Sequence, residues 1–368
     1  MKNIIKILFY FFLFQICLYG QKTGSIKGVV KDAITGETIP FATIVLENTK
    51  LGTYANTSGF FFLKGIPTGK KNIIAGAVGY NKGSFTVEVT ADEVHAVNVK
   101  LDPIPVEIQG VTRISERIKE AYKHEISVQA LSQEEIKIIP STSEKDIFRL
   151  MQVLPGVSST GDVTSQFYVR GGSGDQNLIL YDNMMIYSPF HAFGMFSIFN
   201  TDAIKISEMM TGGFSPEYGG RLSSVMNIVS RDGNSNYYSG KLNVGSSSTQ
   251  AMIEGPFLGG SIVASGRKSY FNDVFKKFLG RDLPLDFYDL NSKITYPISN
   301  TGKFSFNALI SNDKINRSEI FNPNYLWKNG AFGANVQVSI EDYYVDLALS
   351  YSYSQASIDY KNYNDRKN

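Results

Sequence analysis

The stretch that decides the fold runs from Phe167 to Asp232, opening FYVRGGSGDQNLILYDNMMIYSPFHAFGMFSIFN and closing TGGFSPEYGGRLSSVMNIVSRD. Apolar and β-branched runs in it predict short strands, and the glycine pairs between them suit turns that need positive φ. The strands are expected at Phe167 to Arg170, Leu178 to Tyr181, Ile204 to Met209 and Val225 to Ser230. Asp182 and Asn183 separate the runs LILY and MMIY, and both residue types tolerate the left-handed conformation of a two-residue hairpin turn. The stretch therefore predicts a compact mixed domain that contains a hairpin.

Two helix starts precede this stretch. Ser132 and Glu135 have the spacing of a capping box ahead of a short helix that Pro140 would end, and Ser143 with Asp146 repeats that spacing. Apolar residues then follow at helical spacing, at Ile147, Leu150, Met151 and Leu154. We expect the second helix to pack against the sheet of the mixed domain.

The N-terminal part of the chain has the pattern of a separate β domain. Between Gly24 and Leu101 about seven short strands alternate with turns, and no helical period occurs, which predicts a small β-sandwich. Pro103 and Pro105 then favour an extended linker over a helix.

After Asp232 the pattern changes to long segments of period two. Phe304, Phe306, Ala308 and Ile310 alternate with small or polar residues, and similar runs follow around Phe332 and Leu349. Such lengths fit membrane-spanning strands of ~9 to 11 residues better than the strands of a soluble sandwich, which could also alternate. About seven strands are expected, joined by short connections at GPFLGG, ISNTG and IED and by longer ones at 271–286 and 312–328.

The chain start and the composition exclude several classes of protein. Residues 1–20 combine a lysine-bearing start with a short apolar run, which predicts a signal peptide and removal of Cys17, the only cysteine. The net charge of +2 argues against a nucleic-acid-binding protein. His95, His124 and His191 lack zinc-site spacing, and we interpret them as surface or packing residues. No catalytic site can be assembled, so neither an enzyme nor a cofactor is expected.

Three blocks in the central part, VRGGSGDQNLILYD, FGMFSIFNTDAIK and GGFSPEYGGRLSSV, resemble the plug domain of TonB-dependent outer-membrane receptors. The run from Gly24 to Leu63 is similar to the carboxypeptidase-regulatory-like domain that precedes the plug in one subgroup, of Bacteroidetes type. The expected fold is mainly β: a sandwich, an α+β plug and the first strands of a transmembrane antiparallel β-barrel. The expected boundaries are 1–20 for the signal peptide, 21–102 for the sandwich, 103–115 for the linker, 116–233 for the plug and 234–368 for the barrel strands.

The resemblance also implies site residues. The linker occupies the place of the TonB box, the segment that adds a strand to the inner-membrane energy transducer; the alternative is a plain linker. The box would comprise Val106, Glu107, Ile108, Gln109, Gly110, Val111 and Thr112. Arg170 and Arg221 would pair with acidic residues of the barrel wall and hold the plug there, unless they are ordinary surface arginines.

The resemblance implies energy-coupled import of a scarce solute across the outer membrane, with the sandwich and plug on the periplasmic side. The solute could be an iron chelate, a vitamin, an oligosaccharide or a peptide. The expected partners are the transducer, outer-membrane lipid, the solute and, as an open possibility, a surface lipoprotein; nucleic acid is not expected. The alternative is an adhesin that uses the sandwich and barrel as an anchor. Because a plug of roughly 110 residues is too large for the lumen of a small barrel, we expect the chain to be the N-terminal portion of a longer receptor.

Overall fold

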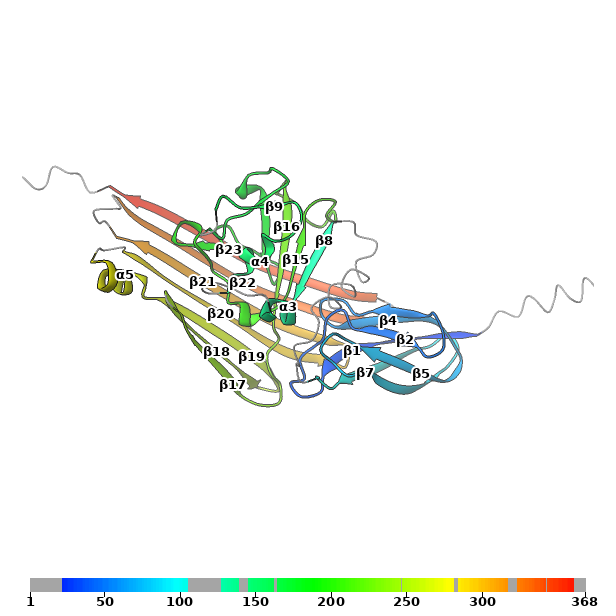
Figure 1. Ribbon diagram of the computed structural model, residues 1–368. Helices are drawn as coiled ribbons and strands as arrows, with labels where there is room; N and C mark the ends of the chain where they lie inside the picture. Colours follow the sequence, from blue (N-terminus) through cyan, green and yellow to red (C-terminus); the bar gives the residue numbers. More distant parts are fainter. Residues whose placement is uncertain are drawn as a thin grey trace, which may run out of the picture.

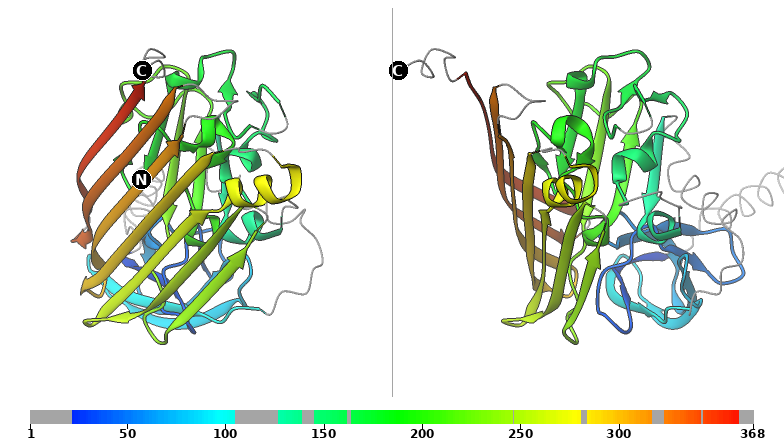
Figure 2. Two further views of the ribbon diagram at one scale, coloured as in Figure 1. Left: turned by 90° about the vertical axis from the view of Figure 1, so that its left-hand side faces the viewer. Right: turned by 60° about the vertical axis from the view of Figure 1, so that its left-hand side comes forward.

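The computed structural model describes residues 22–104, 127–138, 145–161, 164–245, 247–280, 284–316, 323–341 and 343–360. Over these residues the chain forms three parts, namely the sandwich, the plug and a long antiparallel sheet that we call the strand wall (Figure 1). The plug lies against one face of the strand wall, and the sandwich lies at one end of it (Figures 1 and 2).

The sandwich consists of two sheets, as its strand pattern predicts. Its strands are β1 (Thr23–Asp32), β2 (Thr43–Leu46), β3 (Gly52–Tyr54), β4 (Phe60–Pro67), β5 (Gly69–Gly76), β6 (Gly83–Val89) and β7 (Val94–Leu101). One sheet has the order β4-β1-β7 and the other β3-β2-β5-β6. Ile26, Ile44, Phe61 and Ile73 are buried between them. This core belongs to the sandwich alone, so the domain has its own hydrophobic centre.

The plug is built on a five-stranded mixed sheet of order β12-β11-β16-β15-β8. Its main elements are β8 (Val128–Ser132), α3 (Gln133–Ile138), α4 (Ile147–Met151), β11 (Asn177–Tyr181), β12 (Met184–Met185), β15 (Ile204–Met210) and β16 (Ser224–Ser230). Shorter elements are β9 (Val157–Ser158), β10 (Tyr168–Val169), η2 (Gly174–Gln176), β13 (Phe190–His191), η3 (Ala192–Gly194), β14 (Phe196–Ser197) and η4 (Thr201–Ala203). The predicted hairpin is present, since β11 and β12 pair across Asp182 and Asn183, which have φ of 47° and 65°.

The helices of the plug begin close to where the sequence places them. At α3 the backbone N–H of Ser132 donates to Glu135 at 2.9 Å and the N–H of Glu135 donates to the Ser132 hydroxyl at 3.4 Å, which is the predicted capping box. At α4 the prediction that Ser143 caps the helix is wrong, because Asp146 is the N-cap and accepts from the backbone N–H groups of Phe148 and Arg149. Ser143 itself lies outside the described residues.

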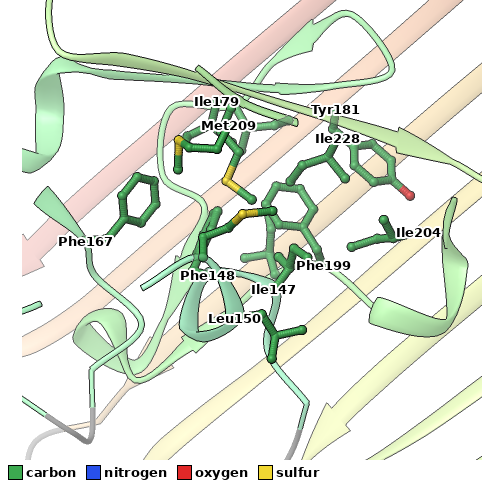
Figure 3. Packing of buried hydrophobic residues seen from close by; sticks show 14 of the residues in the cluster. Ile147, Phe148, Leu150, Phe167, Ile179, Tyr181, Phe199, Ile204, Met209 and Ile228 are labelled. Atoms are coloured by element: carbon green, nitrogen blue, oxygen red, sulfur yellow. The ribbon is translucent and has the colours of Figure 1, made fainter. Parts of the chain in front are cut away.

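The core of the plug lies between its sheet and α4 (Figure 3). Ile147 and Phe148 of α4 are buried against side chains of the sheet, among them Ile179, Met209 and Ile228. Phe148 meets Phe167 and Phe199 with ring centroids 5.2 and 5.6 Å apart. The predicted packing of the second helix on the sheet is therefore confirmed.

The strand wall is an antiparallel sheet of seven strands in sequence order. The strands are β17 (Ser239–Val244), β18 (Ser248–Phe257), β19 (Gly260–Ser269), β20 (Leu285–Ser299), β21 (Gly302–Ile315), β22 (Asn324–Ile340) and β23 (Tyr343–Asp359), and α5 (Phe271–Leu279) connects β19 to β20. Its apolar face points away from the plug: Phe306 is 45% exposed, whereas its neighbour Asn307 is completely buried. The predicted alternation is confirmed, and so is the predicted fold class of sandwich, plug and long antiparallel strands.

Candidate functional site

Two buried clusters of charged residues join the three parts of the molecule. The first, which we call the junction cluster, lies where the sandwich, the plug and the strand wall meet. Its members are Glu37 from the sandwich, Asp182, Lys205, Arg231 and Asp232 from the plug, and Glu254, Lys293 and Lys303 from the strand wall.

Asp232 is the centre of the junction cluster. It follows β16 directly, and its carboxylate accepts from the ammonium groups of Lys205 at 3.1 Å, Lys293 at 3.2 Å and Lys303 at 2.8 Å. The hydroxyl of Thr38, from the sandwich, donates to the same carboxylate at 2.8 Å. Burial alone would raise the pKa of Asp232, but the three lysines outweigh it and hold that pKa well below its usual range. One carboxylate thus binds groups from all three parts of the molecule.

Asp182 supplies a second carboxylate from the tip of the plug hairpin. Its side chain accepts from the backbone N–H of Ser230 at 3.0 Å and from the hydroxyl of the same residue. Lys293 of β20 approaches it at 3.4 Å and donates to the Ser230 carbonyl at 3.1 Å. The turn that the sequence predicts from backbone preference therefore also positions a charge against the strand wall.

Arg231 connects the sandwich to the strand wall. Its guanidinium donates to Glu37 of the sandwich at 3.0 Å and to Glu254 of β18 at 2.8 Å. Glu37 also accepts from the backbone N–H of Asp232 at 2.9 Å. Burial would lower the pKa of Arg231, but attraction to Glu37 and Glu254 outweighs it and raises that pKa.

The charges of the junction cluster balance. Four cationic side chains face four carboxylates, and every one of them makes an ion pair inside the cluster. Removing one partner from a buried pair leaves an uncompensated charge, which costs roughly 3–5 kcal/mol. The cluster therefore stabilises one arrangement of the three parts and penalises partial separation.

The second group, which we call the histidine cluster, joins the plug to the strand wall at a different place. His191 of β13 is completely buried; its Nδ1 lies 2.7 Å from Asp313 of β21 and its Nε2 3.2 Å from Asp289 of β20. The guanidinium of Arg267, on β19, donates to Asp289 at 2.6 Å. The backbone N–H of Ala192 donates to Asp313 at 2.9 Å, so the ring of His191 and the backbone of the next residue both contact the strand wall.

His191 carries a proton in this arrangement more readily than a free histidine. Burial alone would lower its pKa, but the hydrogen bonds to Asp289 and Asp313 outweigh that effect and raise the pKa. When both ring nitrogens are protonated, the ring donates to both carboxylates and, together with Arg267, balances their two negative charges. The ring also stacks on Phe287, with centroids 4.4 Å apart.

The predicted plug arginines lie elsewhere. Arg170 is exposed, with φ of 49°, and its guanidinium reaches the hydroxyl of Ser127 at 3.4 Å. Arg221 donates to the carbonyl of Gly220 at 3.0 Å. Among the described residues, the buried ion pairs between plug and strand wall belong to the junction and histidine clusters, and a more exposed pair joins Asp202 of η4 to Lys241 of β17 at 2.5 Å. A holding role for Arg170 and Arg221 stays a prediction. The predicted box Val106 to Thr112 lies outside the described residues.

The sequence interpretation of the histidines missed the role of His191. His191 is indeed buried by packing, yet it also makes two ion pairs. A signal was available in the sequence, because Arg267, Asp289 and Lys293 fall in segments predicted to cross a membrane, although Asp313 falls in a predicted connection. Charged residues in such segments must face the interior and find partners there.

Two further classes of site are not found in the described part of the chain. No group of three or more His, Cys, Asp or Glu side chains there is arranged to hold a metal ion. No helix there combines the length and the apolar character needed to cross a bilayer.

Family comparisons match two of the three parts. Residues 26–112 match the CarboxypepD_reg-like domain, and residues 120–224 match the TonB-dependent Receptor Plug Domain. Both domains are those that the sequence resemblance predicts, and the plug is a domain of receptors rather than of enzymes. No curated protein matches the sequence.

Solved structures match part of the chain at low identity. The siderophore receptor PirA from Pseudomonas aeruginosa is 15% identical, with 64% of this chain and 42% of that chain covered and a TM-score of 0.47. PirA from Acinetobacter baumannii is also 15% identical, with 65% and 41% covered and a TM-score of 0.48. The copper transporter OprC is 13% identical, with 62% and 37% covered and a TM-score of 0.43. The chain spans about two fifths of the length of the first two structures.

Proposed function

We propose that this chain is part of an outer-membrane TonB-dependent receptor, which imports a scarce solute with energy delivered from the inner membrane. The observation that carries the proposal is the plug domain at residues 120–224, held against a wall of long strands by buried ion pairs. A plug held in this way closes a passage at rest. Moving the plug away from the strand wall would separate these buried ion pairs and leave uncompensated charges. This costs free energy, which an energy transducer would supply.

The surface of the strand wall supports a location in the outer membrane. Its outward face carries apolar side chains such as Phe306, Phe332 and Leu349, and its inward face carries buried polar ones such as Ser305 and Asn307. This is the arrangement of a transmembrane β-barrel, in which the lipid-facing side is apolar and the interior is polar.

The position of the sandwich indicates on which side of the outer membrane it lies. The short connections at Gly259 and Asn300 line the same cavity as sandwich residues. At a third short connection, the backbone carbonyl of Glu341 accepts from the ammonium group of Lys27 of the sandwich at 2.7 Å. In outer-membrane barrels the short turns lie on the periplasmic side. We therefore assign the sandwich, and the start of the linker that follows it, to the periplasm.

The finer features remain part of the proposal. The linker segment Val106 to Thr112 is the proposed docking strand for the transducer, and Arg170 and Arg221 are proposed contacts between plug and barrel. The solute is proposed to be a small molecule of one of the four classes named above. A surface lipoprotein partner is compatible with this function and is not required by it.

The test is energy-dependent uptake by cells that carry the complete receptor. Radiolabelled ferric enterobactin, cyanocobalamin, maltohexaose and a tripeptide would each be offered with and without a protonophore, with cells lacking the receptor as control. We expect one probe to accumulate only in energised cells. If one or more probes bind at the surface and binding and accumulation are the same in energised and de-energised cells, the adhesin alternative would replace the proposal.

A further inference from the structure

The sandwich contacts both the plug and the strand wall through the segment at 34–38, Lys27 of β1 and Phe60 of β4. The carbonyls of Ile34 and Thr35 accept from Asn236 and from the backbone N–H of Ser235, at 2.5 and 2.8 Å. Phe60 stacks on Tyr344 of β23 with ring centroids 4.8 Å apart. These contacts place the sandwich at the point where the plug ends and the strand wall begins (Figure 1).

Within this interface, Glu37 and Thr38 reach into the junction cluster. Glu37 binds the guanidinium of Arg231 and the backbone N–H of Asp232, and Thr38 donates to the Asp232 carboxylate. Thr38 is also in contact with the ammonium group of Lys205. The sandwich thus supplies partners to the two residues, Arg231 and Asp232, that connect the last plug strand to the strand wall.

From these contacts we infer that Glu37 and Thr38 are positioning residues for the attachment of the plug. When the sandwich leaves, Arg231 keeps only Glu254 as a carboxylate partner within the junction cluster, and the N–H of Asp232 loses its acceptor. Docking of the sandwich and attachment of the plug are then one linked equilibrium, in which each favours the other by the same factor.

A cavity at the interface strengthens this linkage. It has a volume of about 280 Å³ and is lined by Glu37, Thr38, Asp232 and Lys303 together with residues of the short turns. Sandwich residues therefore form part of the wall of this open cavity beside the ion pairs of Asp232 and Lys303. Removal of the sandwich would expose these ion pairs further to water, and ion pairs exposed to water stabilise far less than buried ones.

This inference deepens the proposed function and rests on it, because loosening the plug matters only if the plug closes a transport passage. The linkage itself needs neither solute nor transducer. A hydrogen-exchange experiment on the complete receptor in lipid nanodiscs therefore tests it separately from uptake.

The first arm compares Glu37→Gln/Thr38→Val with the matched control Glu88→Gln, which changes an exposed glutamate on β6. We expect amide exchange in β15 and β16 to become at least tenfold faster in the double variant and to stay unchanged in the control. Exchange in β1 and β4 reports whether the sandwich remains folded. Loss of protection at the Asp232 and Ser235 amides would show that a folded sandwich has left its docking position. If exchange in β15 and β16 is nevertheless unchanged, the inference is wrong.

The second arm covers the case in which the double variant fails to fold. A Cβ at Gly36 would lie 3.4 Å from the Cβ of Ser235, close to the spacing of a disulfide, although φ of +73° at Gly36 makes the substitution strained. In Gly36→Cys/Ser235→Cys the oxidised form holds the sandwich in place, and the reduced form of the same protein is its control. We expect β15 and β16 to exchange at least tenfold more slowly when oxidised. Equal exchange in the two redox states would refute the linkage, whereas loss of uptake in every form would refute only the proposed function.

Discussion

His191 shows how a single side chain makes the attachment of the plug depend on pH. Because its pKa is raised in the folded protein, folding takes up a proton. Its contribution to stability is fully present below the unfolded pKa of ~6.5 and is lost as the pH rises through the folded pKa. A neutral ring can donate only one hydrogen bond and leaves one of the two carboxylates, Asp289 or Asp313, without that donor.

We predict that His191→Gln destabilises the plug by about 3–5 kcal/mol at pH 6 and by less at alkaline pH. The free energy of unfolding, measured by urea denaturation with a probe in the plug between pH 6 and 9, should fall with rising pH in the wild type and should be flatter in the variant. His95→Gln, which changes a sandwich histidine outside the cluster, is the control. Parallel pH profiles for wild type and His191→Gln would show that folding leaves the pKa of His191 unchanged.

At the scale of elements, the hairpin of β11 and β12 was predictable because its turn depends on two adjacent residues. Asp182 and Asn183 adopt the left-handed conformation that the sequence predicts. The capping box of α3 was predictable for the same reason, since Ser132 and Glu135 are neighbours in sequence. The cap of α4 was not, because Ser143 and Asp146 both suit an N-cap and local spacing does not choose between them.

Asn183 provides a direct test of this backbone argument. We predict that Asn183→Gly changes stability by only a few tenths of a kcal/mol, while Asn183→Val costs about 1–2 kcal/mol because a β-branched residue is strained at positive φ. Thermal unfolding of the two variants, followed by circular dichroism, would measure the difference. Equal melting temperatures would mean that the turn does not require the left-handed conformation.

The linker gives a prediction about the coupling of the receptor to the energy transducer. If Val106 to Thr112 adds a strand to the transducer, Ile108→Pro removes a ladder hydrogen bond and should abolish uptake without changing solute binding at the cell surface. Ile108→Val keeps the backbone N–H and the β-branched shape, so it should import normally. Uptake of the responsive probe that survives both the proline and deletion of the segment would assign the docking strand elsewhere.

At the scale of the whole molecule, the charged clusters could not be predicted from the sequence. Asp182 and Lys293, or His191 and Asp313, are more than a hundred residues apart, and their meeting depends on how the plug is placed on the strand wall. The sequence does predict the alternation of the strands, and so it indicates which residues share the inward face. It does not indicate which of those residues meet the plug, and for this reason the family resemblance points to Arg170 and Arg221 but not to His191 and Asp232.

The apolar outward face of the strand wall gives the last prediction. Phe306 is 45% exposed on that face, in the first half of β21. If lipid surrounds it, Phe306→Arg should lower the free energy of unfolding in bilayers by about 2–4 kcal/mol. If water surrounds it, the same change should stay within about 0.5 kcal/mol, as expected for the control Ser84→Arg on the exposed part of the sandwich. Urea unfolding of the complete receptor in lipid vesicles measures both variants, and a cost for Phe306→Arg no larger than that of the control would place this face in water and remove the basis for a membrane-spanning wall.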